Sequence, residues 1–183
     1  MKQHNYELKS IISSDDLKTR LESIVDEIRE AMPVDDLIIV ALLKGSFVFL
    51  ADLIRLLYRH NIHMEIDFMA LGSYADSTLS NGEVRLKRDI ETDITGRPVL
   101  IVDDILDTGF TLKRARDLLA ERKPSCLKLC TLLDKPDRRA EHIEADIVGF
   151  TIPNYFVVGY GLDYARRHRE LPFIARLDPE PVG

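Results

Sequence analysis

The residues best suited to chemistry gather in one segment, residues 99–112, which reads VLIVDDILDTGFTL. Two adjacent carboxylates, Asp103 and Asp104, end an apolar run, and Asp107 follows three residues later. A Thr-Gly-Phe-Thr run at 108–111 then opens a predicted helix, whose first N–H groups lack intrahelical acceptors and attract anions. Its glycine permits close backbone approach, and its threonines add hydroxyl donors. Phosphate-binding groups beside carboxylates that bind a diol or a metal ion predict a sugar-phosphate site.

The same segment also has a structural interpretation, a strand-to-helix turn with acidic residues and a threonine N-cap. Each of these features alone is more often structural than functional. Three carboxylates at the end of a buried strand favour function, because packed like charges cost energy unless a ligand or cation is shared. The nucleotide-binding patterns GxxxxGK[ST] and GxGxxG do not occur in the chain.

The elements that must position this segment alternate between helical and strand-like patterns. Apolar residues at helical spacing predict helices over 14–32, 47–59 and about 110–122. Apolar or alternating runs predict strands over 37–43, 62–68, 99–102, 127–133, 147–150 and 156–160. This order predicts an α/β fold with a mainly parallel twisted sheet flanked by helices. We expect a single domain over 1–183, with a core at about 34–160 and a small hood lobe from about 1–20 and 150–183.

Residues 71–83 differ in kind, because they are small and polar and have few apolar anchors. A loop of this length inside a compact domain is typical of a lid or of a disordered segment. We expect a lid.

Composition argues against several classes of protein. A chain of 183 residues, 45% of them hydrophobic, can bury its own core. Its net charge of −6 disfavours sequence-independent nucleic-acid binding. The sequence has no 18-residue apolar stretch and no apolar signal-peptide core, so we expect no membrane partner. Its two cysteines, Cys126 and Cys130, cannot form a disulfide framework, and we expect a cytoplasmic protein.

Five ordered motifs resemble those of type I phosphoribosyltransferases, and within them the bacterial hypoxanthine (hypoxanthine-guanine) branch. The segment 99–112 resembles the family's phosphoribosyl pyrophosphate signature. The other motifs are LLKGS at 42–46, GSY at 72–74, LLDKP at 132–136 and FVVGYGLDY at 156–164. The resemblance implies transfer of a 5-phosphoribosyl group to N9 of hypoxanthine, and of guanine, in purine salvage. It also implies a Mg²⁺ cofactor, small-molecule substrates and a homodimer or homotetramer.

The resemblance implies a role for each residue of the signature. Asp103 and Asp104 would hold the ribose 2′- and 3′-hydroxyls. Asp107 would be the catalytic residue, exchanging a proton with N7 of the purine. The loop around the 5′-phosphate would consist of Asp107, Thr108, Gly109, Phe110 and Thr111.

The resemblance also assigns the pyrophosphate and base sites. Lys44 and Gly45 would form a short pyrophosphate loop, in which the family often has a non-proline cis peptide bond. Ser73 and Tyr74 on the lid, and Arg169, would contact the pyrophosphate as well. Asp163, which the resemblance also assigns to base binding, would hold Mg²⁺, and Asp103 and Asp104 would be further candidate ligands. The remaining base contacts would be Lys135 to the 6-oxygen, Phe156 by stacking and Val157 through its backbone.

Structural alternatives exist for these residues. Lys44 and Lys135 fit turns, Phe156 fits a core position, Asp163 fits a local cap, and residues 166–169 fit a solvated basic face. The chain also departs from the family at Asp103, commonly Glu, and at Phe110, often polar or basic. Two alternative functions stay open, a xanthine-preferring phosphoribosyltransferase and a non-catalytic ligand-sensing regulator on the same fold.

Overall fold

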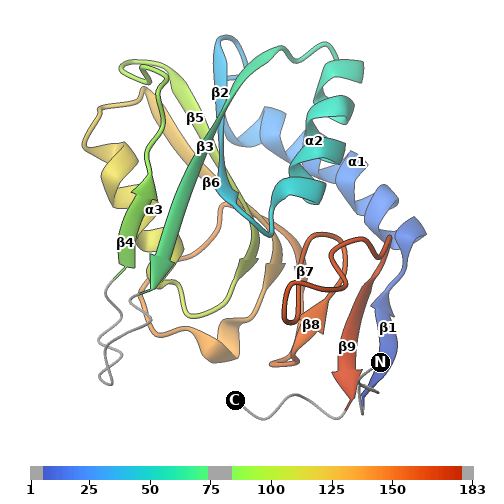
Figure 1. The fold of residues 1–183 in the computed structure, drawn as a ribbon. Helices are drawn as coiled ribbons and strands as arrows, with labels where there is room; N and C mark the ends of the chain where they lie inside the picture. Colours follow the sequence, from blue (N-terminus) through green and yellow to red (C-terminus); the bar gives the residue numbers. More distant parts are fainter. Residues whose placement is uncertain (1–5, 74–83, 179–183) are drawn as a thin grey trace.

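A six-stranded sheet forms the centre of the protein in the computed structural model, which describes residues 6–73 and 84–178 (Figure 1). Its strand order is β4-β3-β2-β5-β6-β7, and every neighbouring pair is parallel except β3 with β4. The strands are β2 (Leu37–Leu43), β3 (Met64–Ser73), β4 (Val84–Arg88), β5 (Pro98–Leu106), β6 (Cys126–Asp134) and β7 (Ile147–Thr151). The predicted α/β class with a mainly parallel sheet is confirmed.

Helices cover both faces of this sheet. The helices α1 (Ser14–Ala31) and α2 (Phe47–Arg59) lie on one face, and α3 (Phe110–Ala120) lies on the other (Figure 1). The buried side of α3 packs with one face of β2 and β5, while α1 and α2 pack with the opposite face. Because β2 is buried on both faces, its unbroken apolar sequence is required by the fold.

A second, smaller sheet joins segments from the two ends of the chain. Strands β1 (Glu7–Ile12), β9 (Ile174–Asp178) and β8 (Val157–Val158) lie in the order β1-β9-β8, and both pairings are antiparallel. The sequence did not predict β1 or β9 as strands, because their short apolar patterns are too weak to indicate a strand until the pairing of the two segments is known.

Several element boundaries differ from the predictions. Strand β5 runs to Leu106, four residues past the predicted end, because β6 continues to pair with it as far as Asp134. Strand β4 was missed because its charged sequence, VRLKR, is typical of an exposed edge. Helix α1 begins at Ser14 as predicted and is capped by Ser13, whose Oγ accepts the Asp16 N–H at 3.1 Å. Most of the expected lid, residues 74–83, lies outside the described residues, and 71–73 belong to β3.

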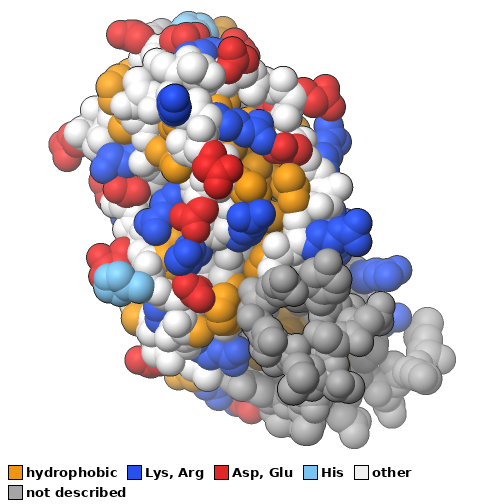
Figure 2. All heavy atoms as spheres, turned by 90° about the vertical axis from the view of Figure 1, so that its left-hand side faces the viewer, with side chains coloured by type: hydrophobic (Ala, Val, Ile, Leu, Met, Phe, Trp, Pro, Cys, Tyr) orange, Lys and Arg blue, Asp and Glu red, His pale blue; other side chains and the backbone are white. Residues whose placement is uncertain are grey.

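Charges of both signs are interspersed on the face that lies to the left in Figure 1 (Figure 2). On α3, for example, Lys113 Nζ lies 2.9 Å from an Asp117 carboxylate oxygen. Both cysteines are unpaired. None of the helices in the described part of the chain is long and apolar enough to cross a membrane.

Candidate active site

A cavity opens where strands β2 and β5 separate. Their pairing ends at Ala41 and Val102, while β2 stays paired with β3 to Leu43 and β5 stays paired with β6 to Leu106. The strand order also reverses between β2 and β5, and ligands of open α/β sheets bind at such switch points, beyond the carboxyl ends of the strands. The cavity has a volume of about 240 Å³. Predicted site residues that line it are Lys44, Asp103, Asp104, Asp107, Thr108, Gly109 and Thr111.

The two adjacent carboxylates lie at the β5 side of this cavity, within the strand. Asp103 is only 7% exposed, and its Oδ1 accepts the N–H of Asp104 at 3.0 Å. Burial, and then the neighbouring Asp104 carboxylate, raise the pKa of Asp103 well above its usual range. Burial also raises the pKa of Asp104, although the nearby Arg169 guanidinium opposes this. Because two buried like charges are unfavourable, the pair retains a proton more readily than an exposed carboxylate would.

The start of α3 faces the same cavity and supplies hydrogen-bond donors. Gly109 is the N-cap residue, with a φ of +92° that strains any residue bearing a Cβ. Among the described residues, no side chain caps this end of the helix, whose first N–H groups have no intrahelical acceptor. Together with the hydroxyls of Thr108 and Thr111, this end can bind a phosphate. Phe110, the first helical residue, does not line the cavity.

The sequence analysis missed two arginines that contact this loop. The guanidinium of Arg139 donates to the carbonyls of Leu106 and Asp107 and also pairs with Asp134, so it joins the ends of β5 and β6. Arg138 Nε forms an ion pair with Asp107 Oδ1 at 3.0 Å. The only sequence signal was a pair of adjacent arginines, a pattern more typical of a solvated surface.

The Lys44–Gly45 loop closes the β2 side of the cavity. The peptide bond between Leu43 and Lys44 is cis, as the resemblance implied. A Cβ on Gly45 would lie 1.7 Å from Asp104 Oδ2 and 2.4 Å from its Cγ. This position therefore requires glycine, because its backbone lies directly against a carboxylate of the signature.

Residues predicted for the base site are not in the lining of this cavity. Lys135 follows β6, is 6% exposed, and donates from Nζ to the Tyr155 carbonyl at 2.5 Å. Val157 is buried in β8 and pairs with β9. The Phe156 ring meets Tyr164 edge-on, with centroids 5.6 Å apart.

The residues predicted for the pyrophosphate site lie in separate segments. Asp163 and Arg169 form an ion pair of 2.5 Å in the segment that follows β8. Ser73 is the last residue of β3, and Tyr74 lies outside the described residues. The structure thus brings Lys44 and the predicted signature residues other than Phe110 to one cavity, whereas the base-site residues lie outside its lining.

Comparison with known proteins agrees with this geometry. The family described as "Phosphoribosyl transferase domain" matches residues 10–165. Hypoxanthine phosphoribosyltransferase of Haemophilus influenzae is 43% identical over 180 residues, which cover 97% of this chain and 98% of that protein. Hypoxanthine-guanine phosphoribosyltransferase of Bacillus subtilis is 41% identical over 179 residues, which cover 98% of this chain and 97% of the relative.

A solved structure agrees as well. The crystal structure of a hypoxanthine-guanine phosphoribosyltransferase from Bacillus anthracis is similar with a TM-score of 0.86 and 43% identity, covering 93% of this chain and 99% of that one. The fold and the site define a phosphoribosyl-binding α/β protein. The chain belongs to the phosphoribosyltransferase family.

Proposed function

We propose that the protein transfers the 5-phosphoribosyl group of phosphoribosyl pyrophosphate to N9 of hypoxanthine, and of guanine, in purine salvage. The products are IMP or GMP and pyrophosphate. The observation that carries this proposal is the cavity between β2 and β5, where Asp103, Asp104 and the uncapped end of α3 face one another. The 41–43% sequence identity to hypoxanthine and hypoxanthine-guanine phosphoribosyltransferases, which extends over nearly the full length, supports the choice of base.

The sugar phosphate binds along the signature in this proposal. The N–H groups and hydroxyls of residues 107–111 hold the 5′-phosphate, and the carboxylates of Asp103 and Asp104 accept hydrogen bonds from the ribose hydroxyls. As the bond from C1′ to the pyrophosphate oxygen breaks, positive charge develops on the ribose, as in glycoside cleavage. The two carboxylates stabilise that charge.

The base binds beside the cavity and loses a proton as N9 bonds to C1′. Asp107 accepts this proton from N7, a step supported by its position in the lining of the cavity. Lys135 donates to the 6-oxygen, Phe156 stacks on the ring, and Val157 contacts the base through its backbone. We also propose that the three-stranded sheet of the chain ends forms a hood over the base, within one domain spanning the chain.

The leaving pyrophosphate is bound by Lys44, Gly45 and Arg169, with Ser73 and Tyr74 contributing from the segment after β3. Mg²⁺ supplies charge neutralisation of the pyrophosphate when bound. The oxygen donors of Asp163, Asp103 and Asp104 fit this ion, because Mg²⁺ commonly uses one or two carboxylates together with substrate phosphates. The described residues contain no group of three or more His, Cys, Asp or Glu that could hold a metal ion.

The assembly and the location of the protein are also part of the proposal. We propose a homodimer or a homotetramer, on the basis of the family resemblance. We propose a cytoplasmic location, which the two unpaired cysteines support.

The test is a pyrophosphate-release assay with the full chain, Mg²⁺, phosphoribosyl pyrophosphate and a panel of hypoxanthine, guanine, xanthine, adenine and orotate. We expect turnover with hypoxanthine and guanine. Preference for xanthine would revise the base, and no turnover with any base would contradict the proposal. Asp107→Ala should lower kcat by about 10²–10⁴-fold while sugar-phosphate binding is largely retained. Lys135→Ala should improve the use of adenine relative to hypoxanthine.

A further inference from the structure

The two proposed halves of the pyrophosphate site come from distant segments that touch through their backbones. Gly161, in the segment of Asp163 and Arg169, has a φ of +102°, and a Cβ there would lie 2.1 Å from the Gly45 carbonyl oxygen. Arg169 holds this segment in shape, because its Nη1 donates to the Gly161 carbonyl at 2.5 Å. The Gly161 N–H in turn donates to the Arg169 carbonyl at 3.0 Å.

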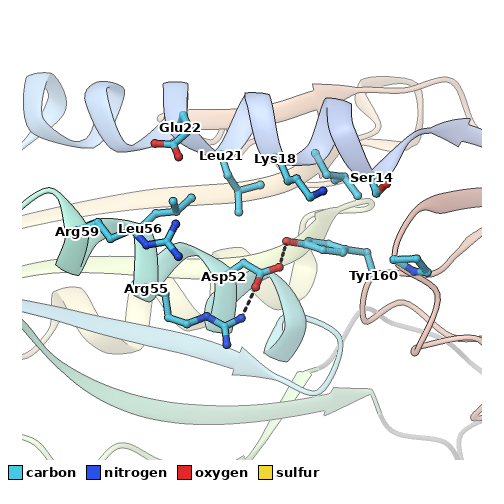
Figure 3. Close-up of a pocket in the computed structure, with 11 residues that line it drawn as sticks. Ser14, Lys18, Leu21, Glu22, Asp52, Arg55, Leu56, Arg59 and Tyr160 are labelled. Carbon is cyan, nitrogen blue, oxygen red and sulfur yellow. Dashed lines mark hydrogen bonds and ion pairs between the residues drawn. The ribbon is translucent and has the colours of Figure 1, made fainter.

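A second contact joins the same two segments farther from the substrate. The residue before Gly161, Tyr160, points its ring between α1 and α2, and its hydroxyl donates to Asp52 Oδ2 at 2.5 Å (Figure 3). Tyr160 is 6% exposed. Burial, and then the hydrogen bond to Asp52, raise the pKa of the phenol above its usual range, so its hydroxyl keeps the proton it donates. Asp52 lies on α2, the helix that begins directly after the Lys44–Gly45 loop.

The Asp52 carboxylate does not depend on the Tyr160 hydroxyl to balance its charge. Asp52 borders a cavity of about 510 Å³ between α1 and α2, and its side chain is 38% exposed. Its other carboxylate oxygen pairs with Arg55 one turn along the helix (Figure 3). Loss of the tyrosine hydroxyl therefore leaves Asp52 solvated and paired. The hydrogen bond fixes the position of the Tyr160 segment on α2. We expect its loss to change the free energy of unfolding only slightly.

We propose that Tyr160 is a positioning residue, whose hydrogen bond to Asp52 holds the Gly161–Arg169 segment against the Lys44–Gly45 loop and so sets the affinity for the pyrophosphate group. This inference rests on the function proposed above. The contacts at Gly161 and at Tyr160 join this segment to the Lys44–Gly45 loop and to the helix that follows the loop, so together they fix its orientation there. Misplacement of binding groups by a distant side chain is a known cause of weakened binding and slowed catalysis.

Tyr160→Phe tests this, because it removes the hydroxyl and keeps the ring. We expect the KM for phosphoribosyl pyrophosphate and the inhibition constant of pyrophosphate to rise about fivefold to tenfold, the effect of one hydrogen bond. The KM for hypoxanthine should change less than about twofold. Tyr58→Phe is the matched control, because Tyr58 lies on α2, as Asp52 does, and is 66% exposed. This variant should leave all three constants unchanged.

Asp52→Ala supplies an independent variant and a double-mutant cycle. The double variant Tyr160→Phe, Asp52→Ala should be no worse than either single variant, because both remove the same contact. Additive effects would overturn the proposal, as would a Tyr160→Phe enzyme with an unchanged KM for the sugar substrate or an equal rise for both substrates. Turnover by the wild-type chain is measured in the same assay. A wild-type chain without turnover contradicts the proposed function, whereas an active wild type with an unaffected Tyr160→Phe contradicts only the positioning role.

Discussion

Two aspartates of the main sheet have nearly the same exposed fraction but differ in the number of hydrogen bonds that their carboxylates accept. Asp67 in β3 is 8% exposed and Asp103 in β5 is 7% exposed. The Asp67 carboxylate accepts the N–H groups of Phe68 and Glu91, both at 2.7 Å, and that of Thr92 at 2.9 Å. Among the described residues, Asp103 accepts one backbone N–H, from Asp104, and it lies beside that residue's carboxylate. A buried aspartate that is fully paired belongs to the framework, whereas one that lacks partners indicates a site that awaits them.

The pKa values express the same contrast. Burial alone would raise the pKa of Asp67, but the three backbone N–H groups outweigh it, so the pKa is lowered. At Asp103, burial and the adjacent carboxylate act together, and the pKa is raised. The folded protein therefore stabilises the charged form of Asp67 and disfavours the charged form of Asp103.

The largest expected effect is on the framework side of the comparison. Asp67→Ala leaves the N–H groups of Glu91 and Thr92 without their acceptor, and we expect a loss of about 3 kcal/mol in the free energy of unfolding. Urea denaturation measures this loss. Asp103→Ala is the matched control, and a similar loss there would erase the distinction between the two residues.

The next effect concerns binding. Asp103→Asn removes a charged acceptor for a ribose hydroxyl, so the dissociation constant for phosphoribosyl pyrophosphate should rise about 10–100-fold. Isothermal titration calorimetry measures it. Asp67→Asn, in protein that remains folded, should bind the same ligand as the wild type does, and equal weakening in both variants would break the comparison.

A smaller effect is a gain in stability from the same substitution. Asp103→Asn removes a group whose ionisation is disfavoured by burial, so the ligand-free variant should melt about 2–4 °C above the wild type near neutral pH. Differential scanning calorimetry without ligand measures the shift. A lower melting temperature would indicate that Asp103 is a framework residue like Asp67.

The smallest effect is on the pH dependence of stability. Because the pKa of Asp103 is raised on folding, the folded state binds more protons than the unfolded state above pH 3.8, and this contribution to stability is lost as pH rises through the folded pKa. The lowered pKa of Asp67 acts in reverse, and its contribution is lost as pH falls through the folded pKa. Stability measured across pH should therefore decline less toward neutral pH in Asp103→Asn than in the wild type. An unchanged profile would contradict the assignment.

Much of the site could be predicted from the sequence because one continuous segment carries it. Residues 99–112 contain a strand end, three carboxylates and a helix start, and local rules of strands and helices position all of them. The three helices and the strands of the main sheet other than β4 were predicted for the same reason. The periodicity of each element is visible within the element itself.

The remaining features depend on contacts between distant residues. Arg139 reaches the carbonyl of Asp107, 32 positions earlier, and Tyr160 reaches Asp52, 108 positions earlier. Strands β1 and β9 pair across almost the whole chain. None of these partners follows from spacing or periodicity, because each depends on how the sheets and helices pack in three dimensions. The requirement for glycine at position 45 likewise becomes clear only when Asp104 is seen against it.

The central claim is that the sparsely paired carboxylates of Asp103 and Asp104 are the ribose site. Binding of phosphoribosyl pyrophosphate should then ionise the pair, since hydroxyl donors favour carboxylates, and should release its proton. The direct measurement is titration calorimetry at saturating ligand and Mg²⁺, near pH 6, in two buffers of different ionisation enthalpy, for the wild type and for Asp103→Asn. We expect the wild type to release more protons per bound ligand than the variant. Equal proton release by the two proteins, with both binding the ligand, would contradict the account.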